Sequence, residues 1–101
     1  MQSKNSNYIA MIRINCFFKA AEGKYDDALE AAIALTAASQ RQDGCIAYDV
    51  FESGTRGEVF MICETWKDQA ALDAHSASDP FKEYVGVMQE CGELKIETFE
   101  F

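Results

Sequence analysis

The chain has 101 residues, a length that suits one domain built around a single hydrophobic core. A composition of 49% hydrophobic and 26% charged residues with a single Pro argues against a disordered or repetitive architecture. The formal charge of -8 would repel phosphate backbones and anionic lipid, so neither nucleic acid nor a membrane is expected as a partner. We expect one domain over residues 1–101, with residues 1–7 as a flexible N-terminal tail.

The cellular compartment and the presence of a metal site can be predicted from the N-terminal residues, the cysteines and the single His. The N-terminal residues are polar, without the basic-then-apolar pattern of a signal peptide, and no apolar run reaches membrane-spanning length, which predicts a cytoplasmic protein. The four cysteines form no C-x-x-C pair, which indicates reduced thiols. A metal site would need at least three convergent ligands and the chain has one His, so no metal is expected.

The N-terminal half begins with a strand and a helix. Residues 8–18 are mostly apolar and free of Gly and Pro, which predicts a strand buried on much of both faces. After Gly23, helical spacing predicts an Ala-rich helix to about Arg41, with acidic residues at its positive N-terminal end. Asp43-Gly44 should end this helix, because Gly readily takes a left-handed conformation.

A β-hairpin is predicted next. Residues 45–52 read as the second strand, and the turn-rich link Ser53-Gly54-Thr55-Arg56-Gly57 follows it. The third strand, residues 58–66, should therefore fold back antiparallel to the second.

Two helices and a strand complete the predicted order. Asp68 can cap a short helix over residues 69–76, and Asp79-Pro80 begins a last helix by placing an acceptor at the cap and Pro in the first turn. The apolar stripe of that last helix must face a sheet. Gly92 ends it, and the loosely alternating residues 93–101 predict a final strand.

This order predicts an α+β fold, a ferredoxin-like antiparallel sheet with helices on one face. The strands carry apolar side chains on both faces: in the first, Ile14 and Cys16 point one way while Met11 and Phe17 point the other. Helices can cover only one face, so the other needs a second sheet, most simply that of an identical subunit. We expect a homodimer in the form of a dimeric α+β barrel.

Three segments carry a resemblance to a known family: Asp43-Gly44-Cys45 before a strand containing Tyr48, the run from Glu64 to His75 (ETWKDQAALDAH), and Asp79-Pro80-Phe81. Over residues 8 to about 94 the chain resembles the antibiotic biosynthesis monooxygenase family of dimeric α+β barrels. The resemblance implies oxygenation of a small phenolic or quinol-type substrate with O₂, without flavin, haem or metal. A deprotonated polyphenol can itself reduce O₂, so the protein need only bind it, remove a proton and exclude water.

The same resemblance points to His75, Glu64 and Trp66 as catalytic residues. His75 has the only side chain whose ordinary pKa lies near neutrality, which makes it the natural proton acceptor, although such a residue near a helix end is often a capping or packing group. Glu64 shares a strand face with Trp66 and could orient His75, act as the base itself, or form an ion pair with Arg13 or Lys95. Trp66 is expected to frame the pocket, with an N–H that could hold a substrate oxygen.

Five further residues are candidates for substrate binding. Asn15 is a polar group on the Met11 and Phe17 side of the first strand and should need a hydrogen-bond partner, and some relatives use an Asn of this strand for substrate. The others are plausible pocket lining or ordinary core between helix and sheet. They are Tyr48, Phe81, Tyr84 and Met88.

Other chemistry remains open. Haem-degrading relatives ligate iron through a His of the last helix, whereas Phe81-Lys82-Glu83-Tyr84-Val85 offers no imidazole, so haem degradation is not expected. Other relatives with the same Glu and His pattern resemble isomerases of small signalling sugars, which use acid–base chemistry without O₂. A non-catalytic dimeric module that binds a small ligand is the third alternative.

Overall fold

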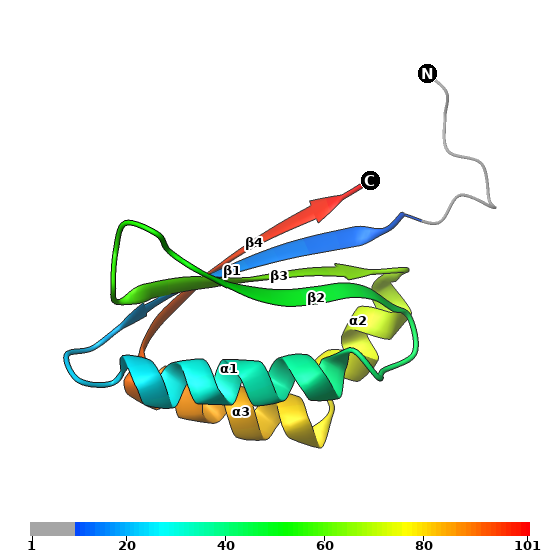
Figure 1. The fold of residues 1–101 in the computed structure, drawn as a ribbon. Coiled ribbons are helices and arrows are strands. Elements are labelled where there is room, and N and C mark those ends of the chain that lie inside the picture. Colours follow the sequence, from blue (N-terminus) through cyan, green and yellow to red (C-terminus); the bar gives the residue numbers. More distant parts are fainter. Residues whose placement is uncertain (1–9) are drawn as a thin grey trace.

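The computed structural model describes residues 10–101 and shows a four-stranded antiparallel sheet with its helices on one face (Figure 1). The predicted ferredoxin-like α+β class is confirmed. The tail predicted at residues 1–7, and residues 8 and 9 of the predicted first strand, lie outside the described residues.

The elements follow the predicted order. They are β1 (Ile12–Ala20), α1 (Tyr25–Ser39), β2 (Cys45–Glu52), β3 (Val59–Trp66), α2 (Gln69–Ser76), α3 (Asp79–Cys91) and β4 (Gly92–Glu100). The strand order β2-β3-β1-β4 places β1 between β3 and β4. Among residues 10–101, no helix is long and apolar enough to cross a membrane.

Several boundaries differ from the sequence prediction: residues 10 and 11 precede β1, α1 ends at Ser39 rather than about Arg41, and two further differences have a clear physical reason. Strand β1 runs to Ala20 rather than Phe18, because Ala20 is still buried and pairs with Gly92 of β4. Helix α3 is capped by Ser78 rather than Asp79, since the Ser78 hydroxyl accepts from the backbone N–H of Phe81. Serine caps a helix as well as aspartate does, so the residue type alone could not choose between these neighbours.

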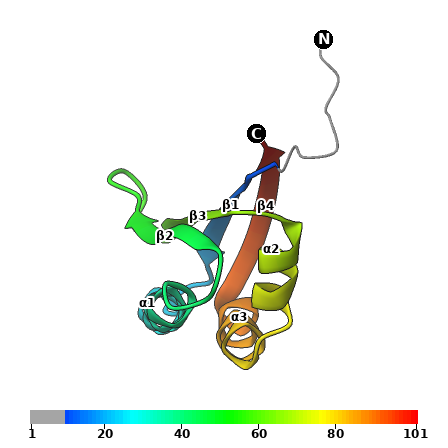
Figure 2. The same ribbon diagram turned by 90° about the vertical axis from the view of Figure 1, so that its right-hand side faces the viewer.

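The core lies between the sheet and helices α1 and α3, which run side by side beneath it (Figure 2). Phe18 of β1 stacks on Phe60 of β3 with ring centroids 4.7 Å apart. On α1 the buried side chains are mostly small, including Ala28 and Ala32, which lets the helix approach the sheet closely. Short helix α2 stands apart at the end of the sheet, where it follows the last residue of β3 (Figure 1).

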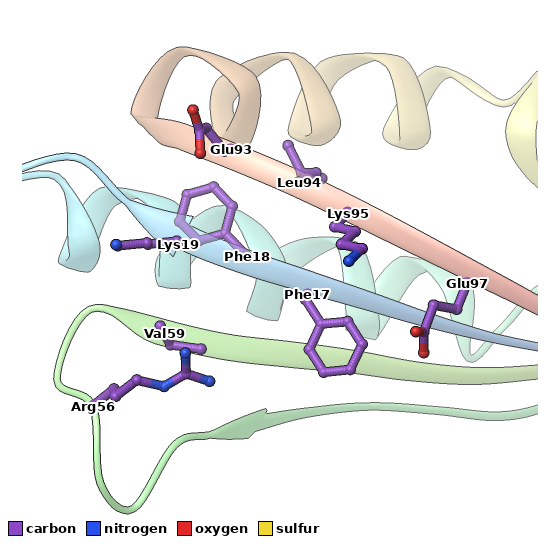
Figure 3. A pocket seen from close by; sticks show the side chains of 9 residues that line it. All are labelled: Phe17, Phe18, Lys19, Arg56, Val59, Glu93, Leu94, Lys95 and Glu97. Atoms are coloured by element: carbon purple, nitrogen blue, oxygen red, sulfur yellow. The ribbon is translucent and has the colours of Figure 1, made fainter.

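Within residues 10–101, no helix covers the other face of the sheet (Figure 2). It presents large apolar side chains with exposed fractions between 36% and 53%: Phe17, Phe51, Phe99 and Phe101. A hollow of about 420 Å³ on this side is surrounded by Phe17, Lys19 and Lys95 from neighbouring strands and by Arg56 from the β2–β3 connection (Figure 3). We call this surface the open face.

Candidate active site

The C-terminal end of strand β3 brings a carboxyl group and an indole together. Glu64 and Trp66 lie on the helix-side face of the sheet because side chains alternate along a strand. The Trp66 Nε1–H donates a hydrogen bond to Glu64 Oε1 over 2.7 Å. Trp66 is completely buried and Glu64 is 6% exposed, so this carboxyl group is largely shielded from water.

Helix α2 places the imidazole of His75 beside Glu64 and Trp66. Its first turn is capped by Asp68, whose carboxylate accepts from the N–H of Ala71 over 2.9 Å, and His75 lies in its last turn. The His75 ring is stacked at a tilt on Trp66, with centroids 4.5 Å apart, and meets the ring of Tyr48 edge-on at 5.6 Å. His75 is only 2% exposed, which removes it from bulk solvent.

The two ring nitrogens of His75 differ in their surroundings. Nδ1 lies 2.7 Å from Oε1 of Gln42, a residue of the turn between α1 and β2. Nε2 lies 3.7 Å from Glu64 Oε1 and has no hydrogen-bond partner among residues 10–101. The imidazole therefore has one satisfied nitrogen and one nitrogen that faces the carboxyl group.

Burial shifts the titration of both groups in opposite directions. Desolvation raises the pKa of Glu64 to about 7, although the hydrogen bond from Trp66 partly opposes this rise. Desolvation lowers the pKa of His75 to about 4. The distance between the two groups would suit an ion pair, but the burial that disfavours both charged forms makes a neutral carboxylic acid beside a neutral imidazole the stable state near pH 5.5.

A cavity of about 110 Å³ borders this pair. Its polar side chains include Glu64, His75 and Tyr48, which are in mutual contact, while its walls are otherwise mainly apolar. The apolar wall residues come from the sheet and from all the helices shown in Figure 1: Ile14, Leu35, Ile62, Leu72, Phe81, Val85, Met88, Leu94 and Ile96. A small apolar pocket with a few convergent polar groups is typical of a small-molecule site.

The structure brings most predicted site residues to this cavity. Tyr48, Phe81 and Met88 line it together with Glu64 and His75, and Trp66 forms the layer behind them. Tyr84 does not line it, because its side chain borders the groove between α3 and α1 instead.

Asn15 is also separated from the cavity. It alternates with the cavity residues Ile14 and Cys16 and therefore lies on the open face, the side on which Met11 and Phe17 were expected. Arg13 shares that face and donates to the hydroxyl of Thr65, so the alternative in which Arg13 pairs with Glu64 is wrong. Lys95 lies beside Phe17 on the open face, which also removes it as a partner of Glu64.

Two residues of this site were missed by sequence reasoning: Gln42 and Ser78. The Gln42 amide Nε2 donates to the Ser78 hydroxyl over 3.2 Å while its oxygen meets the imidazole, so one side chain links the α1–β2 turn to both ends of the α2–α3 junction. Glutamine in a turn has no local signature for such a role. Across residues 10–101, no three His, Cys, Asp or Glu side chains converge as a metal site would require.

The model of the antibiotic biosynthesis monooxygenase family matches residues 11–87 of the chain. The chain belongs to this family. This member is 30% identical to YcnE of Bacillus subtilis, which is named as a candidate monooxygenase, over 79% of the present chain and 84% of YcnE.

Solved structures share this fold. A conserved protein of Bacteroides thetaiotaomicron, described as a candidate oxidoreductase, superposes with a TM-score of 0.90 at 51% identity, covering 93% of the present chain and 100% of the other. A candidate antibiotic biosynthesis monooxygenase of Deinococcus radiodurans superposes with a TM-score of 0.83 at 21% identity, covering 89% and 91%. At that identity the second likeness supports the fold alone.

Proposed function

We propose that this family member is a cofactor-independent monooxygenase that acts on a small phenolic or quinol-type substrate with O₂. The observation that carries the proposal is the contact between a buried carboxyl group and a buried imidazole at the wall of a small apolar cavity. The name of YcnE points to the same class of reaction, and the description of the Bacteroides protein points to the broader class of oxidoreductases.

The chemistry needs little from the protein beyond proton handling and exclusion of water. A phenolate gives electrons to O₂ far more readily than the phenol does, so removal of the hydroxyl proton starts the reaction. One oxygen atom then enters the product, and the other leaves as water with two hydrogen atoms of the substrate, which itself supplies the electrons. The apolar walls would shelter the radical pair from water.

We assign the base role to Glu64 and a hydrogen-bond acceptor role to His75. A pKa of about 7 suits a general base that works near neutral pH, whereas an imidazole with a pKa of about 4 is a weaker proton acceptor. His75 Nε2, which lies 3.7 Å from Glu64 Oε1, can share the hydrogen bond of the substrate hydroxyl and so hold that hydroxyl where Glu64 takes its proton.

Oxygen consumption by the purified protein with a panel of hydroquinones tests the proposal, with anaerobic incubations as blanks. Glu64→Gln should lower kcat by about 100-fold or more, the usual contribution of a general base, and His75→Phe, which removes the hydrogen-bond acceptor, should lower kcat as well. Glu90→Gln, at an exposed position of α3, is the matched control and should leave kcat unchanged. If the wild-type protein consumes no oxygen with any member of the panel, the monooxygenase proposal fails; anaerobic turnover of a small carbonyl compound would then favour an isomerase.

We also propose that two copies of the chain pair through the open face. Four phenylalanines there are between 36% and 53% exposed, more apolar surface than a lone soluble domain usually presents on one side of a sheet. Phe17→Asp should therefore give a monomer by size-exclusion chromatography with light scattering. Ile33→Asp, at a residue of α1 that is 53% exposed, should leave the dimer intact, and a monomeric wild type would contradict the proposal.

A further inference from the structure

We infer that Gln42 is a positioning residue that holds His75 in the tautomer with its proton on Nδ1, so that Nε2 remains a free acceptor beside Glu64. The inference deepens the proposed function and rests on it for its kinetic consequences. It is argued from a series of hydrogen bonds among His75, Gln42 and Ser78 that allows only one placement of the protons on these groups.

The series of hydrogen bonds starts at the Ser78 hydroxyl. The Ser78 hydroxyl lies 2.6 Å from the backbone carbonyl of His75, which can only accept, so the hydroxyl proton is committed there. The same oxygen can then only accept from the Gln42 side chain, and the group that faces it over 3.2 Å must be the amide NH₂.

This orientation fixes the imidazole. With its NH₂ toward Ser78, Gln42 presents its carbonyl oxygen to His75 Nδ1 at 2.7 Å, and a carbonyl oxygen can only accept. Nδ1 must therefore carry the proton, and in a neutral ring Nε2 is then the unprotonated nitrogen. The absence of any hydrogen-bond partner for Nε2 among residues 10–101 agrees with a lone pair held free for a ligand.

Gln42 itself is held firmly enough to impose this choice. Its backbone N–H bonds to the carbonyl of Ser39 and its carbonyl accepts from Cys45, so both sides of the residue are tied to neighbouring elements. Two residues on, Gly44 has φ +82° and its carbonyl accepts from the N–H of Lys67, which attaches the turn to the start of α2. The turn and the helix that carries His75 therefore form one connected unit.

The tautomer matters for Glu64. A proton on Nε2 would place a positive partial charge 3.7 Å from the carboxylate oxygen, which would stabilise the ionised form and weaken Glu64 as a base at neutral pH. The other titratable side chains packed against the pair, Tyr48, Cys16 and Cys45, have pKa values raised by burial and stay neutral in this range. Gln42 thus determines whether the carboxyl group keeps the pKa that its reaction needs.

Nitrogen-15 NMR of the imidazole tests this directly and without substrate. The sequence contains one His, so protein labelled with ¹⁵N-histidine gives the ring signals of His75 alone. At pH 7 the wild type should show a protonated Nδ1 and an unprotonated Nε2. Gln42→Met, which keeps the length but removes the acceptor, should shift the population toward the Nε2–H tautomer. Gln69→Met makes the same change at an exposed position of the helix that carries His75 and should leave the pattern unchanged.

A second variant guards against misfolding of the first. Gln42→Glu keeps an acceptor at Nδ1 and adds a charge, so the pKa of His75 should rise by at least one unit. A wild type in the Nε2–H tautomer, a Gln42→Met pattern identical to wild type, or an unchanged titration in Gln42→Glu would each overturn the inference.

Kinetics separate this inference from the proposed function. In Gln42→Met the acid limb of the pH profile of kcat/KM for hydroquinone oxidation should move to lower pH, with kcat reduced about tenfold and KM little changed. An acid limb that stays in place would show that Gln42 has only a structural role. If the tautomer behaves as expected but the wild type consumes no oxygen, the proposed monooxygenase function fails while the assignment of the proton stands.

Discussion

The opposite titration shifts of Glu64 and His75 predict that their contributions to the pH dependence of stability have opposite signs. For Glu64 the folded-state pKa of about 7 lies above the ordinary value of 4.5, so the folded state binds more protons between these values and stability falls as pH rises from 4.5 to 7. For His75 the folded-state pKa of about 4 lies below 6.5, so stability is present above pH 6.5 and is lost as pH falls toward 4.

The magnitude of each contribution follows from the shift. Each shift is about 2.5 pH units, and at about 1.4 kcal/mol per unit each group contributes about 3 kcal/mol. Both groups are at least 94% buried, so solvent screening reduces these values little. In the wild type the two slopes nearly cancel over the range from about pH 4.5 to 6.5, in which both groups titrate.

Single substitutions should separate the contributions of Glu64 and His75 to the pH dependence of the free energy of unfolding. Relative to wild type, Glu64→Gln should gain about 3 kcal/mol in the free energy of unfolding as pH rises from 4.5 to 7. His75→Phe, which retains ring packing, should lose about the same amount relative to wild type as pH rises from 4 to 6.5. Urea unfolding at half-unit pH steps measures both difference curves. Curves that stay level, or that slope in the same direction, would refute the neutral-pair description of this site.

Three other substitutions test the architecture around the pair. Trp66→Phe removes the N–H that bonds to Glu64 Oε1, so it should destabilise the fold by about 1–3 kcal/mol and move the acid limb of kcat/KM to higher pH. An acid limb that does not move would mean that this hydrogen bond does not lower the pKa of the carboxyl group. Gly44→Ala should lower the free energy of unfolding in urea by about 3 kcal/mol, because Gly44 has φ +82° and the new Cβ would lie 2.5 Å from the Cβ of Ala71 on α2. Gly23→Ala, at φ +76° with open space around it, should cost only about 1 kcal/mol. Equal losses would contradict the close approach of the turn to α2. Met88→Ala, at a fully buried position of the cavity wall, should lower the free energy of unfolding by about 2–5 kcal/mol. The larger cavity should also improve kcat/KM for bulkier hydroquinones relative to hydroquinone itself. Unchanged selectivity would mean that the substrate binds elsewhere.

Most of the fold could be predicted because its signals are local. The helical spacing of α1, the turn-rich link after β2 and the cap at Asp68 each reflect the preferences of a few neighbouring residues, and all three appear in the structure as expected. The pairing of Glu64 with Trp66 belongs to the same class, because residues two apart on a strand must share a face.

Contacts between distant segments were decided by the tertiary structure. Tyr84 and Phe81 share the predicted apolar stripe of α3, but only the placement of the helix under the sheet sends one to the groove beside α1 and the other to the cavity. The pKa shifts of Glu64 and His75 likewise arise from burial, which no local pattern measures.

The amino-acid sequence by itself determined the order of the elements, the two faces of the sheet and the stretch in which the carboxyl, indole and imidazole groups lie. The tertiary structure decided which groups meet: it placed Asn15 on the open face, removed Arg13 as a partner of Glu64, and brought Gln42 to His75 across 33 positions of the chain. Periodicity reports which way a side chain points from its own strand or helix. The partner that it meets depends on how the elements pack, and that is a property of the whole domain.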